Sequence, residues 1–206
     1  MLVIEWAQFL RSGLPLGEKL SSMTIGVFDG VHRGHQALIE RVVSHNLPGL
    51  CPAQPGMEAG KRDYTPTVIT FRQNHKTGET PDIQTFHQKI EVLERLGIKI
   101  TIVIDFTESF RRMAGIDFLE ILLKHGNIGF FAVGSDFRCG YRLDTDADAI
   151  QKYFSSHNIP SEIVPEVMED GLPISSSRIR SAIACGDLAL AEKMLGRPLS
   201  MTPKTS

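Results

Sequence analysis

Short runs of β-branched and other apolar residues alternate along the chain with longer segments in which apolar residues recur at helical spacing. The short runs predict five strands, at residues 22–28, 67–71, 98–106, 128–133 and 162–164. The longer segments predict helices at residues 35–44, 86–96, 116–124, 147–157, 176–185 and 188–195. Strands that alternate with helices form βαβ units, so the pattern predicts an α/β protein with a doubly wound parallel sheet of five strands and helices at its C-terminal end.

The carboxyl ends of the predicted strands are the first places to look for a site. In an open parallel sheet, ligands bind beyond these ends, near the point where the strand order reverses. The relevant segments follow Val27, Thr70, Ile104 and Val133.

One segment interrupts the alternation. Residues 46–66 hold four prolines and three glycines without any period, which predicts a long surface loop. The final six residues, MTPKTS, predict a frayed tail. A chain of 206 residues fits a single domain.

Composition narrows the classes of protein. Hydrophobic residues make up 42% of the chain and charged residues 22%, and the net charge is -2, which is typical of a soluble globular protein and argues against a basic nucleic-acid binder. No apolar run is long enough to span a membrane, and the first residues lack the basic region of a signal peptide. Cys51, Cys139 and Cys185 are odd in number and widely spaced, so neither a disulfide framework nor a zinc site is indicated. We expect a cytoplasmic protein with no membrane or nucleic-acid partner; the oligomeric state is left open.

The most informative segment, GVFDGVHRGH, runs from Gly26 to His35, between a predicted strand and a predicted helix. Its glycines allow tight turns and close approach of a ligand to the backbone. The helix that begins near Gly34 offers free N–H groups and a positive dipole end, which suit a phosphate. His32 and His35 flank this helix start, and imidazoles donate hydrogen bonds to phosphate oxygens, more strongly when protonated. The segment is neither a P-loop nor a G-x-G-x-x-G motif.

A second segment, ISSSRIR, begins at Ile174 and leads into another predicted helix. Its serines provide a helix cap and extra hydrogen-bond donors. Arg178 and Arg180 put positive charge in the first turn, where a cation opposes the helix dipole, so an anionic ligand would explain them. A plain serine cap with solvated arginines is the alternative.

These segments resemble motifs of the bacterial FAD synthetases, a branch of the HxGH nucleotidyltransferase superfamily. Residues 26–35 match G-x-F-D-G-x-H-x-G-H, and residues 174–180 resemble I-S-S-T-R-I-R, with Ser177 where threonine is common. Residues 133–140 are similar to V-G-x-D-F-R-F-G. With weaker matches, the resemblance covers about residues 22–198, and it implies a Rossmann-like nucleotidyltransferase fold.

The resemblance also implies a reaction and its residues. AMP would pass from ATP to FMN, giving FAD and pyrophosphate, with Mg²⁺ present and its protein ligands unknown. No covalent intermediate is needed, because the attacking phosphate is already an anion. His32, His35 and Arg178 would act on the triphosphate. The expected ATP-binding residues are Gly26, Val27, Phe28, Asp29, Gly30, Gly34, Ser175, Ser176, Ser177 and Arg180.

The flavin side departs from the family pattern. The resemblance implies flavin contacts from Thr70, Phe71, Phe106, Asp136, Phe137 and Arg138. Cys139 stands where the family usually has phenylalanine, and Gln73, Asn74 and His75 replace its P-H-P. Two alternatives therefore stay open: a nucleotidyltransferase with another phosphorylated acceptor, such as a sugar phosphate or phosphopantetheine, and a non-catalytic nucleotide- or flavin-binding protein.

Bacterial enzymes of this type usually carry a riboflavin kinase domain after the adenylyltransferase domain. The sequence stops shortly after LGRP at residues 195–198. We therefore expect one nucleotidyltransferase domain, without a kinase domain, that receives FMN made elsewhere.

Overall fold

The computed structural model describes residues 1–45, 63–72 and 82–199. Its centre is a six-stranded sheet of order β1-β4-β3-β2-β5-β8, in which every neighbouring pair is parallel. The strands are β1 (Leu2–Glu5), β2 (Leu20–Ile25), β3 (Tyr64–Phe71), β4 (Ile100–Ile104), β5 (Ile128–Gly134) and β8 (Ser161–Val164). The predicted doubly wound α/β fold is confirmed.

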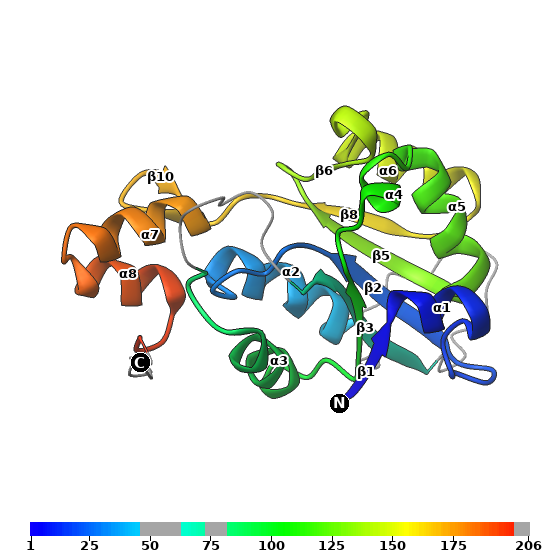
Figure 1. Ribbon diagram of the computed structural model, residues 1–206, viewed down its shortest axis with the longest axis horizontal. Coiled ribbons are helices and arrows are strands. Elements are labelled where there is room, and N and C mark those ends of the chain that lie inside the picture. Colours follow the sequence, from blue (N-terminus) through cyan, green and yellow to red (C-terminus); the bar gives the residue numbers. More distant parts are fainter. Residues whose placement is uncertain (46–62, 73–81, 200–206) are drawn as a thin grey trace.

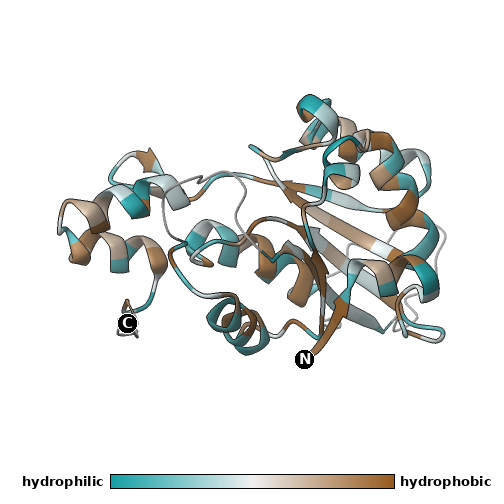
Figure 2. Cartoon of the chain, in the orientation of Figure 1, coloured by the Kyte–Doolittle hydropathy of each residue, from teal (hydrophilic) through white to brown (hydrophobic). Residues whose placement is uncertain are grey.

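Helices cover both faces of the sheet (Figure 1). They are α1 (Trp6–Ser12), α2 (Arg33–Ser44), α3 (Phe86–Arg95), α4 (Glu108–Arg111), α5 (Gly115–His125), α6 (Ala147–Ser156), α7 (Ser176–Ala184) and α8 (Leu188–Leu195). One buried cluster joins α1, α5 and α6 to the sheet, and another joins α2 and α3 to the opposite face. Figure 2 shows the corresponding hydrophobic colouring along the central strands and the inner sides of the helices.

The last two helices form a separate small core at one end of the molecule (Figure 1). They lie beside a two-stranded hairpin of β9 (Met168–Glu169) and β10 (Leu172–Pro173). After the carboxyl end of β5, β6 (Arg138–Cys139) pairs with β7 (Thr145–Asp146), with a 3-10 turn at Tyr141–Leu143 between them.

The prediction of five strands is wrong by one, because β1 was missed. This strand has four residues at the edge of the sheet, and only Ile4 is buried. One buried position carries no alternating pattern, so the strand is defined by its pairing with β4, in which Leu2 lies opposite Ile100.

Two predicted boundaries also shift. The expected loop at 46–66 is wrong at its end, because residues 64–66 belong to β3, where Tyr64 pairs with Leu20 of β2. Residues 46–62 and the tail at 201–206 lie outside the described residues. The first predicted strand ends early, since Phe28 has a φ of 52°, a left-handed conformation that no strand residue adopts.

Candidate active site

A cavity of about 450 Å³ opens beyond the carboxyl ends of β2 and β5. β2 has β3 on one side and β5 on the other, so the strand order reverses here, and this is where open α/β sheets bind ligands. Three of the segments predicted from sequence line the cavity together: the histidine segment, the serine segment and the segment after β5. The predicted site residues that line it are Gly26, Val27, Asp29, Gly34, His32, His35, Ser175, Ser176, Ser177, Arg180, Phe71, Phe106, Asp136, Phe137 and Arg138.

The turn after β2 is held in an unusual backbone conformation. Phe28, Gly30 and Val31 have φ values of 52°, 80° and 39°, and the two non-glycine residues there carry strain that surrounding contacts must offset. Phe28 is fully buried. Gly30 has the side chains of Ile83 and Leu195 within about 3.2 Å of where a Cβ would stand. Phe28 and Gly30 therefore support the cavity from behind and do not line it.

His32 and His35 form a stacked pair at the start of α2. His32 is the N-cap, and its Nδ1 accepts a 3.3 Å hydrogen bond from the backbone N–H of His35. The ring centroids are 3.6 Å apart, with 17° between the planes. A side chain on Gly34 would approach the His32 ring to 3.2 Å, so the glycine between the histidines leaves room for the stacking. Because Nδ1 accepts, a neutral His32 carries its proton on Nε2.

Both imidazoles are neutral at neutral pH. Burial, with a contribution from Arg197, lowers the pKa of His32 to about 4. Burial also lowers the pKa of His35, with help from His32 and from Lys89. The Nδ1 atom of His35 is buried and has no hydrogen-bond partner among the described residues. In the unliganded site the rings are therefore not protonated, and the stronger hydrogen-bond donation expected of protonated rings does not apply there.

Asp29 connects the two segments that were singled out in the sequence. Its carboxylate is buried and accepts a 2.9 Å hydrogen bond from the backbone N–H of Ile83 through Oδ1. Its Oδ2 forms an ion pair with Arg180. Its backbone oxygen accepts a 2.8 Å bond from the hydroxyl of Ser176. These bonds hold the start of α7 against the turn after β2, so Asp29 organises the site.

The serine segment forms the start of α7. Ser175 is the N-cap, and its hydroxyl accepts a 3.2 Å bond from the backbone N–H of Arg178. Ser176 is committed to Asp29, and Ser177 lines the cavity with the two preceding serines. The same serines thus cap the helix and line the cavity, so a capping role does not exclude a role in binding an anionic ligand.

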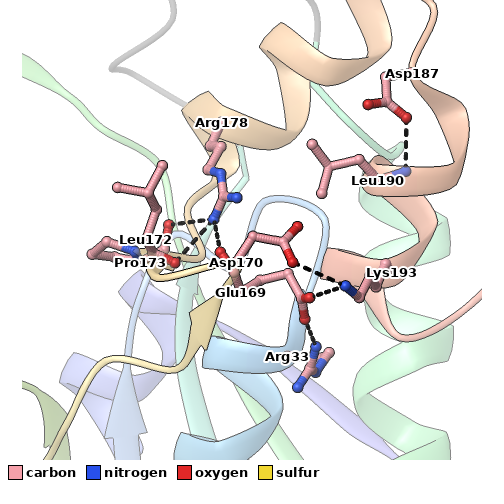
Figure 3. Close-up of polar contacts among 9 residues, drawn as sticks. All are labelled: Arg33, Glu169, Asp170, Leu172, Pro173, Arg178, Asp187, Leu190 and Lys193. Carbon is pink, nitrogen blue, oxygen red and sulfur yellow. Dashed lines mark hydrogen bonds and ion pairs between the residues drawn. The ribbon is translucent and has the colours of Figure 1, made fainter.

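Arg178 does not line the cavity. Its Nη1 donates to the backbone oxygens of Glu169 at 2.8 Å, Leu172 at 2.9 Å and Pro173 at 3.4 Å, so the side chain lies along the β9–β10 hairpin (Figure 3). In this arrangement Arg178 lies away from the cavity to which the sequence assigned it as a triphosphate ligand. Arg180, two residues further along α7, is the arginine of the segment that lines the cavity.

The hairpin also binds α2 and α8 (Figure 3). Glu169 forms ion pairs with Arg33, which stands between the two histidines in sequence, and with Lys193 of α8. Asp170 adds a 3.2 Å contact to Lys193. Hydrogen bonds from both partners lower the pKa of Glu169, so this carboxylate is ionised at neutral pH.

The other end of the cavity is apolar and aromatic. The ring of Phe71 lies 5.7 Å from that of Phe106 and 6.0 Å from that of Phe110, which in turn lies 5.8 Å from Phe118. Phe110 and Phe118 were missed in the sequence because aromatic residues at helical spacing look like ordinary core. Thr70, expected near the flavin, is instead buried and donates a 3.1 Å bond to the backbone oxygen of Val27.

Two departures from the family pattern have different outcomes. Cys139 lines the aromatic part of the cavity, and burial together with the nearby charge of Asp144 raises the pKa of its thiol to about 12. It is therefore a small neutral side chain in a wide recess. Gln73, Asn74 and His75 lie outside the described residues.

Three further residues that support the turn were missed in the sequence. The Lys89 ammonium donates to the backbone oxygens of Val27 and Phe71, and the Gln84 amide donates to that of Phe28 at 3.2 Å. Arg197 in turn donates to the Gln84 side chain at 2.7 Å. Sequence spacing gives no signal for such contacts, which join segments far apart along the chain.

No group of three or more His, Cys, Asp or Glu side chains suited to hold a metal ion occurs within 1–45, 63–72 and 82–199. In the same described ranges, no helix has the length and apolar character needed to cross a membrane.

The fold and the position of the site define a Rossmann-like α/β protein of the nucleotidyltransferase type. Comparison with protein families gives the more particular assignment. The model described as FAD synthetase matches residues 17–178, most of the chain, and the chain belongs to this family.

Curated relatives agree with the family assignment. The chain is 31% identical over 186 residues to the bifunctional riboflavin kinase/FMN adenylyltransferase of Escherichia coli K12, covering 87% of the chain and 55% of that protein. The protein of the same name from Haemophilus influenzae is 30% identical over 182 residues, covering 86% and 55%. The chain thus spans about half the length of these relatives.

A solved structure shares the fold. The crystal structure described as a macrolide-efflux protein from Streptococcus pneumoniae has a TM-score of 0.76 and 26% sequence identity, covering 97% of this chain and 61% of that one. That description applies to the streptococcal protein.

Proposed function

We propose that the chain transfers AMP from ATP to FMN, forming FAD and pyrophosphate. The observation that carries the proposal is one continuous cavity with two chemically different ends. One end has the histidine pair and the starts of α2 and α7, which suit phosphates. The other end has the aromatic residues, which suit a planar ring system.

In the proposed reaction, a phosphate oxygen of FMN attacks the α-phosphorus of ATP. The new oxygen–phosphorus bond forms as the bond between the α-phosphorus and the bridging oxygen breaks, and pyrophosphate leaves with that electron pair. The nucleophile is already an anion, so no side chain has to remove a proton. Catalysis then consists of positioning the two phosphates and stabilising the charge that develops on the equatorial and leaving oxygens.

The histidines and α7 divide this work. His32 donates from Nε2, because its Nδ1 is occupied by the N–H of His35. An anionic phosphate close to this ring raises the pKa of the imidazole. The hydrogen bond that Nε2 donates becomes stronger as a result. Ser175, Ser177 and the first N–H groups of α7 hold the pyrophosphate, and Arg180 supplies positive charge beside them. Arg178 joins only when it leaves the hairpin oxygens.

Magnesium would arrive bound to the phosphates of ATP and would neutralise part of their charge. Mg²⁺ prefers oxygen ligands, usually substrate phosphates with one or two carboxylates. Asp136 and Glu166 line the cavity and are the carboxylates available to it, since that of Asp29 is bound to Arg180 and Ile83.

A different phosphorylated acceptor is the second candidate, and Cys139 favours keeping it in view. A small side chain in the aromatic recess leaves space that a phenylalanine would fill. The net charge of -2 is close to neutral, so anionic ligands would be held by local hydrogen-bond donors. We place the reaction in the cytoplasm, with nucleotides and flavin as the partners. The described residues account for one nucleotidyltransferase domain.

The decisive experiment measures pyrophosphate release from ATP with and without FMN, together with FAD formation by chromatography. FMN-dependent release with equal amounts of FAD is the expected result. Riboflavin, which lacks the attacking phosphate, is the matched control acceptor. Release with a sugar phosphate or phosphopantetheine but not with FMN would support the second candidate. Flavin binding without any pyrophosphate release would contradict an enzymatic function.

A further inference from the structure

Lys89 has a buried ammonium directly behind the candidate site, and the reaction outlined above does not use it. It lies in the second turn of α3 and is 6% exposed, which makes it the one buried lysine or arginine in the described part of the chain. Its Nζ donates to the backbone oxygen of Phe71 at 2.7 Å and to that of Val27 at 3.2 Å. It also lies 5.6 Å from the centre of the Phe86 ring.

A buried ammonium is costly unless its protons are bound. An apolar side chain such as methionine would fill the same place on α3 at a lower cost of desolvation. The ammonium must therefore do something at this position that an apolar group could not do. Burial lowers the pKa of Lys89 to about 8, and the charges of Asp82 and Asp29 oppose that change.

The two carbonyls that Lys89 binds lie where regular pairing between β2 and β3 has ended. The pairing runs to Ile25 opposite Ile69, and a last backbone bond joins Gly26 to Ile69. Beyond that bond, Lys89 joins Val27 of one strand end to Phe71 of the next. Each of these residues lines the cavity, Val27 beside the histidines and Phe71 in the aromatic recess. One side chain thus fixes the two ends of the site relative to each other.

The same contact acts on the histidine pair. The carbonyl of Val27 directly precedes Phe28, whose left-handed φ of 52° places its ring 5.1 Å from that of His35. Holding that carbonyl stabilises the strained turn and the surface on which His35 rests. The ammonium charge also favours the neutral form of His35.

We propose that Lys89 is a positioning residue for the transfer reaction, joining the ends of β2 and β3 so that the histidine pair and the aromatic recess hold their two substrates at reacting distance. The inference rests on the proposed function for its kinetic part. The charged and titratable groups around Lys89 are His35 on α2, Asp29 in the turn and Asp82 before α3, and Arg72 lies over the same Phe86 ring at 5.1 Å.

The test compares Lys89→Met with Lys152→Met, an exposed lysine of α6, in the full chain. Lys89→Met is expected to lower kcat for FAD formation by about 10²-fold, the effect that a displacement near 1 Å can have, while Lys152→Met leaves it unchanged. Titration of the histidine rings by NMR provides a readout that needs no catalysis. The pKa of His35 is expected to rise in Lys89→Met and to stay unchanged in Lys152→Met.

Lys89→Arg keeps the test decisive if Lys89→Met does not fold. Arginine holds its charge throughout the accessible pH range, whereas wild-type Lys89 loses its proton near pH 8. The wild-type rate should therefore fall on the alkaline side near that pH, and this fall should be missing in Lys89→Arg. An unchanged alkaline fall in Lys89→Arg, a kcat of Lys89→Met close to wild type, or an unchanged His35 pKa would each overturn the inference. Wild-type protein that makes no FAD would instead overturn the proposed function, and the NMR titration would then judge Lys89 alone.

Discussion

Asp29 and Arg180 form an ion pair, buried on the Asp29 side, that joins the turn after β2 to the second turn of α7. The Asp29 side chain is 4% exposed and that of Arg180 18%. The two residues are 151 positions apart along the chain, so the pair connects an early and a late segment of the sequence at the site.

Replacing Asp29 by asparagine should destabilise the fold as well as the site. The substitution leaves the Arg180 guanidinium, which is 18% exposed, without its counter-charge. Breaking a fully buried pair from one side typically costs about 3–5 kcal/mol, and we expect a smaller loss here because Arg180 is partly exposed. Urea denaturation of Asp29→Asn should show a clear loss of unfolding free energy. The exposed pair between Glu108 of α4 and Arg112, its C-cap residue, gives the control, because surface pairs contribute little. A midpoint for Asp29→Asn as close to wild type as that of Glu108→Gln would contradict the structural role given to Asp29.

His32 can be separated into its two roles by choice of substitution. Asparagine is a good N-cap, so His32→Asn should keep the start of α2 while removing the Nε2 donor. We expect FAD formation to fall by about 10²-fold in His32→Asn, in line with the loss of one oxyanion donor, with little change in thermal midpoint. His32→Ala should lose similar activity and also some stability. Activity of His32→Asn near that of wild type would remove His32 from the reaction.

Stability should fall as the pH is lowered through the range where free histidine titrates. The folded protein holds His32 neutral down to about pH 4, whereas the unfolded chain takes up a proton near pH 6.5. Between these values the unfolded state binds more protons, so the free energy of unfolding decreases with falling pH. The stability contribution of a neutral His32 is complete above about pH 6.5 and is lost towards pH 4, amounting to about 3 kcal/mol at most. The free energy of unfolding, measured by denaturation at several pH values in this range, should depend less steeply on pH in His32→Asn than in the wild type. An identical dependence would contradict the neutral state assigned to His32.

Arg178 should matter for the hairpin before it matters for a ligand. Its three bonds go to hairpin oxygens, so Arg178→Ala should speed amide hydrogen exchange in β9 and β10 in the unliganded protein. Arg142→Ala, an exposed residue beside Tyr141, is a suitable control. If ATP and FMN bound to the wild type also raise exchange in the hairpin, Arg178 has been released toward the phosphates. Protection that stays unchanged on binding would keep Arg178 as a structural residue.

The sequence predicted the interior strands and the β8 edge of the sheet but missed its β1 edge. β4 is buried at every residue and β5 at every residue but Gly134, so they appear as nearly continuous apolar runs. β1 buries Ile4 alone, and no local pattern distinguishes it from a loop. The turn after β2 was located through its glycines and histidines, because backbone conformation and helix capping are local properties.

The site was predictable where chemistry is local and unpredictable where it depends on direction. Arg178 and Arg180 are two residues apart near the start of α7, and residues at this spacing on a helix point to nearly opposite sides. Only one of them can face the cavity, and the spacing does not say which. Lys89 shows the same limit, since a lysine in an amphipathic helix looks solvated until the ends of β2 and β3 are placed beside it.

Glu169 has a mechanical consequence for the molecule. One carboxylate pairs with Arg33 of the histidine segment and with Lys193 of α8 at once, so it links the start of α2 to α8. A displacement of α8 that keeps both ion pairs would therefore also displace Arg33, the residue between His32 and Gly34.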